Sequence, residues 1–280
     1  MKFRDDMSGV VNEPDTGLIF VELSHEWGHY TPPTPGFRDI QVYRAATHAS
    51  HGVLTQRIVT AMHHGTHLNA PVHLAQGGAG AGELPLETFF GVGVVLPVPK
   101  GEWEYIEPAD LEAACRESGL TVDAGDIVVL NTGWHQYFAD DMNYFCHGPG
   151  LSEAAARWLA GRGVKLAGVD TATVDHPLAT SFAQSHRGLG PFVIELPRRY
   201  RARTGRDVAA DFPDWNPAHR VLARAGIPAI ENVGGSVDAV TGMRCAFHAC
   251  PWPWPEADAC VIRLVAILDP SRAYRLERGI

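Results

Sequence analysis

Residues 63–73 read HHGTHLNAPVH and place four histidines, His63, His64, His67 and His73, within eleven positions. A single histidine is readily explained by a neutral imidazole that hydrogen-bonds to nearby backbone groups. Four histidines in one short segment, broken by Gly65 and stopped by Pro71, are instead typical of a metal site. Imidazole nitrogens suit zinc, manganese or iron, and an amide or carboxylate oxygen can complete the ligand set. The segment therefore predicts a metal centre.

The same segment is predicted to be a tight turn rather than a helix. It follows an apolar run at residues 53–62 that reads as a strand, so it lies where a strand ends. Glycine inside the histidine spacing and proline just after it are unfavourable in a helix. The glutamate of an H-E-x-x-H helix is also missing. A turn can still bring side chains four and six residues apart onto one ion.

Strand-like and helix-like segments alternate along the rest of the chain. The runs that read as strands are residues 53–62, 92–98, 127–131, 165–170, 227–233 and 259–268. The runs that read as helices are residues 108–117, 152–159 and 217–224, the last with Asn216 as its cap. This mixture over the whole length predicts one α/β domain covering residues 1–280, with a mixed sheet or a barrel-like core. The glycine-rich segment 77–82 is expected to be a flexible loop.

Bulk composition limits the classes of partner. The net charge of −9 argues against nucleic acid and anionic membranes as partners, and no window approaches 18 unbroken apolar residues. The N-terminal residues lack the apolar core of a signal peptide, so export is not expected. The five cysteines show no C-x-x-C spacing and are expected to be reduced thiols. We therefore expect a cytoplasmic protein that acts on a small molecule.

Two polar residues outside the cluster are candidates for the same site. Glu231 interrupts an apolar strand pattern and is followed by Asn232, and a buried carboxylate is costly unless it is paired or bound to a metal. The alternative is a glutamate on an edge strand that faces water. His219 lies in the predicted helix 217–224, where it could equally be a surface imidazole. The residues alone leave both questions open.

Tryptophans on a proline-rich frame suggest a substrate surface. The segment CPWPWP at residues 250–255 holds Trp252 and Trp254 rigidly. An aromatic wall for a flat or apolar substrate is predicted from Trp27, Trp134, Phe182 and Trp252, with Trp254 beside them. The alternative is that these tryptophans pack on proline at a subunit contact.

The histidine segment resembles the signature H-x-G-T-H-x-D-x-P-x-H of the cyclase family of hydrolases, which includes kynurenine formamidase and isatin hydrolase. In this resemblance His63 and His67 take the places of the first two metal-binding histidines, and His73 takes the place of a proton-transfer histidine. Asn69 stands where the family has a metal-binding aspartate. A neutral amide oxygen can bind a cation, but it cannot bridge two cations as a carboxylate does.

A second pattern extends the resemblance. His219 and Glu231 are similar to the H-x11-E pair that binds a second ion in family members with two metals. Leu23-Ser24-His25, Asn131-Thr132-Gly133-Trp134 and Gly168-Val169-Asp170-Thr171, with Asp175 shortly after, also look like family segments. The resemblance covers roughly residues 20–270. It implies the family's swivelling β/β/α fold and assembly as a homodimer or homotetramer.

The resemblance implies a metal-dependent hydrolase that cleaves a C–N amide bond of an aryl formamide or a cyclic amide. The expected ion is Zn²⁺, with Mn²⁺ as the second choice. Its predicted ligands are His63, His67, Asn69, His219 and Glu231, and the predicted catalytic residues are His73 and Glu231. Three alternatives stay open: a lactone hydrolase, a metal-dependent cyclase or dehydratase, and a metal-binding homologue whose catalysis is impaired by Asn69. The serine-hydrolase motif G-x-S-x-G is absent from the sequence.

Overall fold

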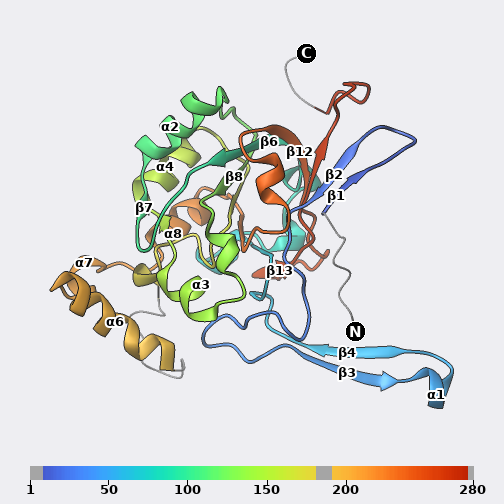
Figure 1. The fold of residues 1–280 in the computed structure, drawn as a ribbon, viewed down its shortest axis with the longest axis horizontal. Coiled ribbons are helices and arrows are strands. Elements are labelled where there is room, and N and C mark those ends of the chain that lie inside the picture. The colour runs from blue at the N-terminus through green and yellow to red at the C-terminus, as the bar shows by residue number, and fades with distance from the viewer. Residues whose placement is uncertain (1–8, 181–190, 277–280) are drawn as a thin grey trace.

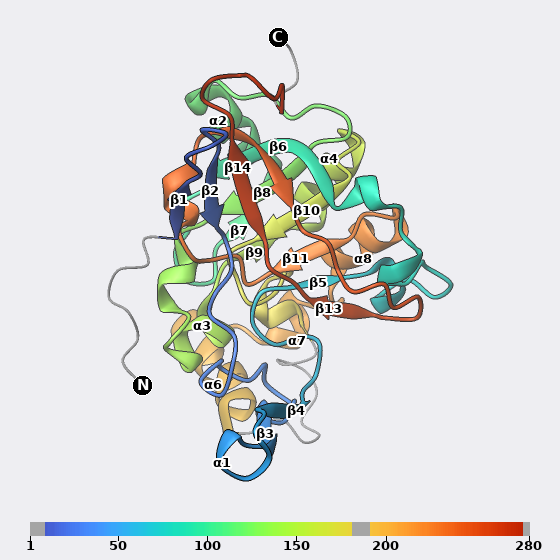
Figure 2. The ribbon, with the colours of Figure 1, turned by 90° about the vertical axis from the view of Figure 1, so that its right-hand side faces the viewer.

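A curled, mixed β-sheet forms the centre of the molecule (Figures 1 and 2). The structure, a computed structural model, describes residues 9–180 and 191–276. Within these residues the sheet has ten strands, in the order β1 (Val10–Asn12), β2 (Ile19–Glu22), β14 (Val265–Leu268), β12 (Arg244–His248), β6 (Phe90–Pro97), β8 (Ile127–Asn131), β10 (Leu166–Val169), β11 (Ala229–Glu231), β5 (His67–Asn69) and β13 (Ala259–Val261). The prediction of an α/β fold with a mixed or barrel-like sheet is confirmed.

The four central strands β6, β8, β10 and β11 run parallel, and the strands on both sides of them are antiparallel. Their sequences are nearly continuous apolar runs because both faces of the central sheet are covered. The predicted strands at 92–98, 127–131, 165–170 and 227–233 are therefore confirmed. The predicted strand at 259–268 is divided by residues 262–264 into β13 and β14.

Three helices cover the outer face of the sheet, on the left of Figure 1: α2 (Pro108–Ser118), α4 (Glu153–Gly161) and α8 (Pro217–Arg224). Their ends follow the sequence signals that predicted them. Ser152 caps α4 by accepting a hydrogen bond from the Ala155 amide, and Gly119 ends α2 in the left-handed region at φ 69°. The three predicted helices are confirmed to within about two residues, the usual spread of helix boundaries.

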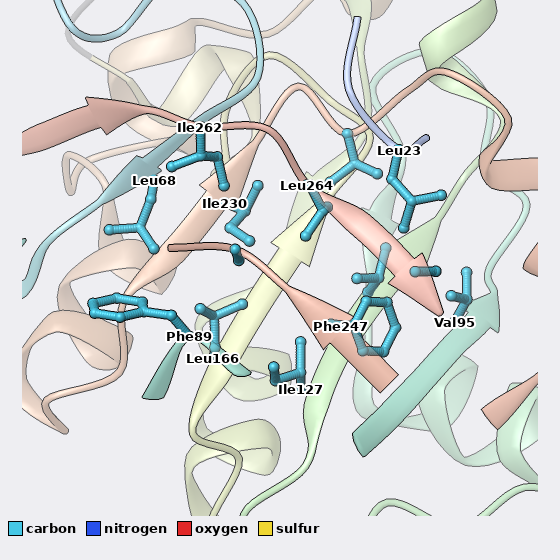
Figure 3. Packing of buried hydrophobic residues seen from close by; sticks show 14 of the residues in the cluster. Leu23, Leu68, Phe89, Val95, Ile127, Leu166, Ile230, Phe247, Ile262 and Leu264 are labelled. Atoms are coloured by element: carbon cyan, nitrogen blue, oxygen red, sulfur yellow. The ribbon is translucent and has the colours of Figure 1, made fainter. Parts of the chain in front are cut away.

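Side chains alternate along the central strands between two apolar cores. Ile127 and Val129 belong to the core inside the curl of the sheet, whereas Val128 and Leu130 pack under the helices. Figure 3 shows the inner core, in which Leu68 of β5 and Ile230 of β11 lie near Leu166 of β10. The strand that follows the histidine turn is thus anchored in the main core.

The remaining elements lie around this body. They are β3 (Gln41–Ala46), α1 (His48–His51), β4 (Thr55–Val59), β7 (Tyr105–Ile106), α3 (Asp141–His147), β9 (Gly150–Leu151), α6 (Pro191–Thr204) and α7 (Val208–Asp211). Short 3-10 helices occur at Pro71–His73, Ala81–Glu83, Leu86–Thr88, Trp134–Tyr137, Pro177–Ala179 and Val237–Val240. Within the described ranges, no helix has the length and apolar character needed to cross a bilayer.

Strands β3 and β4 form a separate hairpin that projects from the body (Figure 1). The predicted strand at residues 53–62 is confirmed only over Thr55–Val59, and it does not belong to the core sheet. Val53, Leu54, Ile58 and Val59 are each about half exposed. An apolar run of this length is equally consistent with a buried strand, which is why the sequence suggested one.

The glycine-rich segment at 77–82 is packed against the proline-tryptophan turn at 250–255. The amide of Ala81 donates to the Ala257 carbonyl at 2.9 Å, and the amide of Gly82 donates to the Trp254 carbonyl at 2.9 Å. A Cβ atom on Gly80 would lie 1.7 Å from the Pro255 carbonyl oxygen. The expectation of a flexible loop is therefore wrong for residues 80–82, where glycine permits two backbones to approach closely.

Candidate metal centre

Four imidazole rings meet at one end of the curled sheet. His63, His67 and His73 come from the histidine turn, and His219 comes from α8. The ring centroids of His63 lie 5.2 Å from those of His67 and 4.5 Å from those of His73. The centroids of His73 and His219 are 5.7 Å apart. Residues distant in sequence are thus brought into one cluster of potential nitrogen ligands. The fourth histidine of the turn, His64, is buried elsewhere and its carbonyl accepts a hydrogen bond from the Trp27 indole.

The turn has the shape that its sequence predicted. Gly65 adopts φ 65°, a left-handed conformation that favours glycine, and it lies against the Trp27 ring. Thr66 donates its hydroxyl proton to the Asn232 carbonyl, which ties the turn to the end of β11. His67 then opens β5, which pairs with β11 on one side and β13 on the other. His63 and His67 are brought together without an α-helix, and His73 ends the short 3-10 helix Pro71–His73.

Glu231 faces His67 directly across the pair of antiparallel strands β11 and β5. Its Oε2 atom lies 3.2 Å from His67 Nε2, and its Oε1 atom lies 3.7 Å from His219 Nδ1. Oε1 also accepts a hydrogen bond from the Val174 amide at 2.8 Å. Burial raises the pKa of Glu231, but the contacts with His67 and His219 and this hydrogen bond outweigh it, so the pKa lies below its ordinary value. The carboxylate is buried and charged, and it does not face water at a sheet edge.

His219 is held by a carboxylate that caps its helix. Asp175 Oδ1 accepts from the Ala218 amide at 2.7 Å, and Asp175 Oδ2 accepts from the His219 amide at 3.2 Å. Asn216 occupies the cap position at φ 49° without a side-chain hydrogen bond to the helix. The predicted cap is therefore corrected from Asn216 to Asp175. Burial lowers the pKa of His219 to about 4, which keeps the imidazole in the neutral form that metals bind.

Asn69 stands at the position where the resembled signature has an aspartate. In the register of the sheet Asn69 pairs with Ala229 of β11 and Ala259 of β13, and its side chain is buried. Among the described residues, neither its Oδ1 nor its Nδ2 has a hydrogen-bond partner. An unpaired buried polar atom costs roughly 1–3 kcal/mol. Asn69 lies two positions after His67 on β5, and therefore on the same face of the strand, so its unpaired Oδ1 atom fits a ligand of a divalent cation.

A further carboxylate, which the sequence analysis missed, lies at the opposite side of the cluster. Asp258 Oδ2 is 3.0 Å from His63 Nε2 and 3.6 Å from His73 Nδ1. These three atoms all lie within 4.8 Å of one another, as ligands of a single ion would. Asp258 immediately precedes β13, and its carbonyl accepts from the Ala70 amide at 2.8 Å. The only sequence signal was an acidic residue at the start of the strand predicted at 259–268.

The cluster opens into a cavity of about 470 Å³. Phe37 and Trp215 contribute aromatic side chains to its wall, and the Phe37 ring stacks on His63 with 5.7 Å between centroids. Neither aromatic residue was predicted, although the Pro-rich segment that ends at Phe37 is visible in the sequence. Thr173, Thr180 and Arg220 supply polar groups. The cavity can thus hold a flat ring beside the imidazoles.

The tryptophans predicted to bind substrate lie elsewhere. Trp134 is buried against Tyr137 and donates to the Tyr144 carbonyl. Trp27 and Trp252 line a separate, mostly apolar cavity of about 810 Å³ beside the β3–β4 hairpin. Phe182 lies outside the described residues. The structure therefore does not bring this aromatic group together around the histidines, because the CPWPWP turn packs on the glycine-rich segment.

Comparison with known proteins identifies a family for this chain. The model of the Cyclase family, described as putative cyclase, matches residues 21–176. Kynurenine formamidase from Bordetella pertussis is 31% identical over 140 residues, which cover 49% of this chain and 60% of that protein. The matched segment is thus less than two thirds of that relative's length.

Solved structures show the same fold. Isatin hydrolase A from Ralstonia solanacearum superposes with a TM-score of 0.71 at 18% identity, covering 90% of this chain and 92% of that one. A protein described as a predicted metal-dependent hydrolase, from Bacillus stearothermophilus, superposes with a TM-score of 0.62 at 20% identity, covering 90% and 98% of the two chains.

Proposed function

Because the chain belongs to the cyclase family, we propose that it is a metal-dependent hydrolase that cleaves the C–N amide bond of a small aromatic or cyclic substrate. One observation carries the proposal: His63, His67, His73 and His219 converge with the charged Glu231 at the wall of a cavity. The unpaired Oδ1 atom of Asn69 and the approach of His67 Nε2 to the Glu231 carboxylate at 3.2 Å support a cation in this cluster.

The ligands that we assign to the ion are His63, His67, His219 and Glu231, with the amide oxygen of Asn69 as a neutral ligand. Imidazole and carboxylate donors suit Zn²⁺ first and Mn²⁺ second. When bound, such an ion supplies a water nucleophile at neutral pH and polarises the substrate carbonyl. Glu231 provides the negative charge that a desolvated dication requires.

His73 is the proposed proton-transfer residue. Its ring lies 4.5 Å from His63 and 5.7 Å from His219, and it lines the cavity. Burial, followed by the charge of His63, lowers the pKa of His73, so the imidazole is a neutral base at pH 7. It would accept a proton from the attacking water and deliver it to the leaving nitrogen. Glu231, buried behind the ligands, would stabilise the protonated imidazole.

The relatives suggest the first substrates to test. One relative is named a kynurenine formamidase and one structural neighbour an isatin hydrolase. The cavity of about 470 Å³ is within the usual size range for small-molecule sites. Phe37 and Trp215 would contact the ring of an aryl formamide or a cyclic amide.

The test is hydrolysis of formanilide, isatin and an aromatic lactone by metal-depleted protein and by protein to which Zn²⁺ or Mn²⁺ is restored. We expect restored metal to increase amide hydrolysis at least a hundredfold, in line with the role of a metal-activated nucleophile. His67→Ala is expected to abolish this increase, and His48→Ala, an exposed histidine on the projecting hairpin, serves as the control. Full amide hydrolysis by protein verified to be metal-free contradicts the proposal. Turnover of the lactone alone assigns the alternative activity.

We also propose a homo-oligomer in a reducing compartment such as the cytoplasm. The half-exposed apolar residues of the β3–β4 hairpin support a contact between subunits, because such patches are rarely left in water. Cys115, Cys146, Cys250 and Cys260 are free thiols, which is usual for cytoplasmic proteins.

A further inference from the structure

The proposed ligand set is short of negative charge on one side. Glu231 lies between His67 and His219, and the Val174 amide already uses its Oε1 atom. On the side of His63 and His73, the histidine turn itself offers only neutral donors, since position 69 is asparagine. A dication taken out of water is strongly disfavoured unless anionic ligands compensate for its lost hydration.

Asp258 places an anionic oxygen on that side. Its Oδ2 atom lies 3.0 Å from His63 Nε2 and 3.6 Å from His73 Nδ1. Two ligand atoms that each bind one ion at about 2.0–2.2 Å are separated by roughly 3–3.5 Å in common coordination geometries. The His63 and Asp258 atoms therefore already have the spacing of two ligands of one ion.

The backbone fixes Asp258 beside the strand that carries Asn69. Asn69 pairs with Ala259 in the register of β5 and β13, so Asp258 lies one position beyond it. The Asp258 carbonyl accepts from Ala70, and the preceding Ala257 carbonyl accepts from Ala81. The side chain is 54% exposed, so this side of the cluster is open to water. A carboxylate is thus held close to the asparagine by main-chain contacts on both sides.

We propose that Asp258 is a ligand of the metal ion and supplies the carboxylate that Asn69 lacks. The inference rests on the proposed metal-dependent function and deepens it by naming a ligand from a different strand. His63 and Asp258 bind the ion from the open side, and Glu231 supplies the second negative charge from the buried side. In this proposal the carboxylate comes from the start of β13 and not from β5.

The competing explanation is a plain ion pair between Asp258 and His63. Such a pair, with one partner half exposed, stabilises the fold only slightly and adds no anionic ligand to the ion. The two explanations therefore predict different responses of the metal-free protein and of metal binding when the charge is removed.

The test compares Asp258→Asn with wild type and with Glu256→Gln, which removes a charge from an exposed carboxylate two residues away. Zn²⁺ affinity is measured by competition with a chromogenic chelator, and bound metal is counted by elemental analysis. We expect Asp258→Asn to weaken Zn²⁺ binding at least tenfold, the smallest loss usual for partners of metal sites. Glu256→Gln should bind like wild type. Adding Asn69→Asp to Asp258→Asn should recover affinity, because it restores one carboxylate.

Melting temperatures in the presence of a chelator establish that the variants fold. Equal Zn²⁺ affinity for wild type and Asp258→Asn overturns the role of Asp258 while leaving the metal-dependent function intact. A lower melting temperature of metal-free Asp258→Asn with unchanged affinity assigns the ion pair instead. Absence of Zn²⁺ and Mn²⁺ binding by wild type overturns the proposed function itself.

Discussion

Asn69 is the residue at which this chain departs from H-x-G-T-H-x-D-x-P-x-H, and its surroundings show the physical consequence. The amide is buried, and within the described chain neither of its polar atoms is hydrogen-bonded. Asparagine retains the shape of aspartate but not its charge, so other residues must supply the charge. In our proposal Glu231 supplies it from β11, and Asp258 lies close enough to do so from the start of β13.

His73 provides the sharpest test at the scale of a single residue. We expect His73→Gln to lower kcat for the best amide substrate by about 10²–10⁴-fold, because glutamine cannot transfer the proton. The metal content should stay the same, since the assigned ligands remain. Steady-state kinetics together with elemental analysis measures both. Unchanged kcat would show that His73 has no part in proton transfer, and loss of the metal would show that it is a ligand.

At the scale of elements, α8 depends on a cap that comes from a loop far away in sequence. Asp175 binds the amides of Ala218 and His219, and these bonds fix the helix that presents His219. Asp175→Ala should lower the free energy of unfolding by about 1–2 kcal/mol, the upper range for loss of a helix cap. Chemical denaturation measures this, with the exposed Asp214→Ala as the control. Equal stability of the two variants would contradict the capping role.

The 3-10 helix Trp134–Tyr137 carries a histidine whose charge should stabilise the fold. His135 Nδ1 lies 3.1 Å from the buried Asp170, and His135 Nε2 lies 3.3 Å from Asp238. The hydrogen bond to Asp170, opposed by burial and aided by the two negative charges, raises the pKa of His135 above its usual 6.5. A raised pKa in the folded state means that this stabilisation is complete below pH 6.5 and is lost as the pH rises through the folded value.

We therefore expect His135→Gln to reduce stability more at pH 5.5 than at pH 9. Denaturant unfolding of wild type and variant at both pH values gives the difference directly. A difference in stability that is independent of pH, or larger at pH 9, would contradict the charged pair with Asp170.

Local patterns predicted the parallel strands at the centre of the sheet and the three helices that cover it, but they missed β1, β2, β3, β12 and the helices α3 and α6. The apolar runs at 92–98 and 127–131 are strands because both faces of the central sheet are buried, and the helices begin and end at their Ser, Pro and Gly signals. Residues 53–62 show the same kind of apolar run, but they form an exposed hairpin. Nothing local distinguishes an apolar strand in the core from one that projects from the body.

The residues of the candidate site also fall into two groups, those that the local sequence suggested and those that it missed. The histidine turn was predicted because its ligands are close in sequence, and Glu231 because a carboxylate in an apolar strand is costly. Asp258 and Phe37 reach the site only through strand pairing and the path of the N-terminal loop. The spacing of residues along the chain carries no signal of such contacts. The predicted tryptophans do not line the site. A proline-rich turn packs against another backbone segment as readily as it binds a ligand, and the sequence does not distinguish the two.

At the scale of the whole molecule, the projecting hairpin should decide assembly. Ile58→Asp with Val59→Asp places two charges on its apolar surface, where both residues are about half exposed. We expect a smaller particle mass by light scattering and a nearly unchanged melting temperature of the separated subunit. Charged residues buried at a subunit contact disfavour association because they lose hydration. The same mass as wild type would show that the subunits associate elsewhere or not at all.

The proposed chemistry requires a divalent ion bound by the histidines of the turn, by His219 of α8 and by Glu231. Crystals grown with Zn²⁺, with diffraction data collected at the zinc absorption edge, test this most directly. We predict one dominant anomalous peak in contact with His63 and His67. Crystals saturated with Zn²⁺ in which the His63 and His67 rings point apart, with no anomalous peak between them, would contradict the proposed metal site.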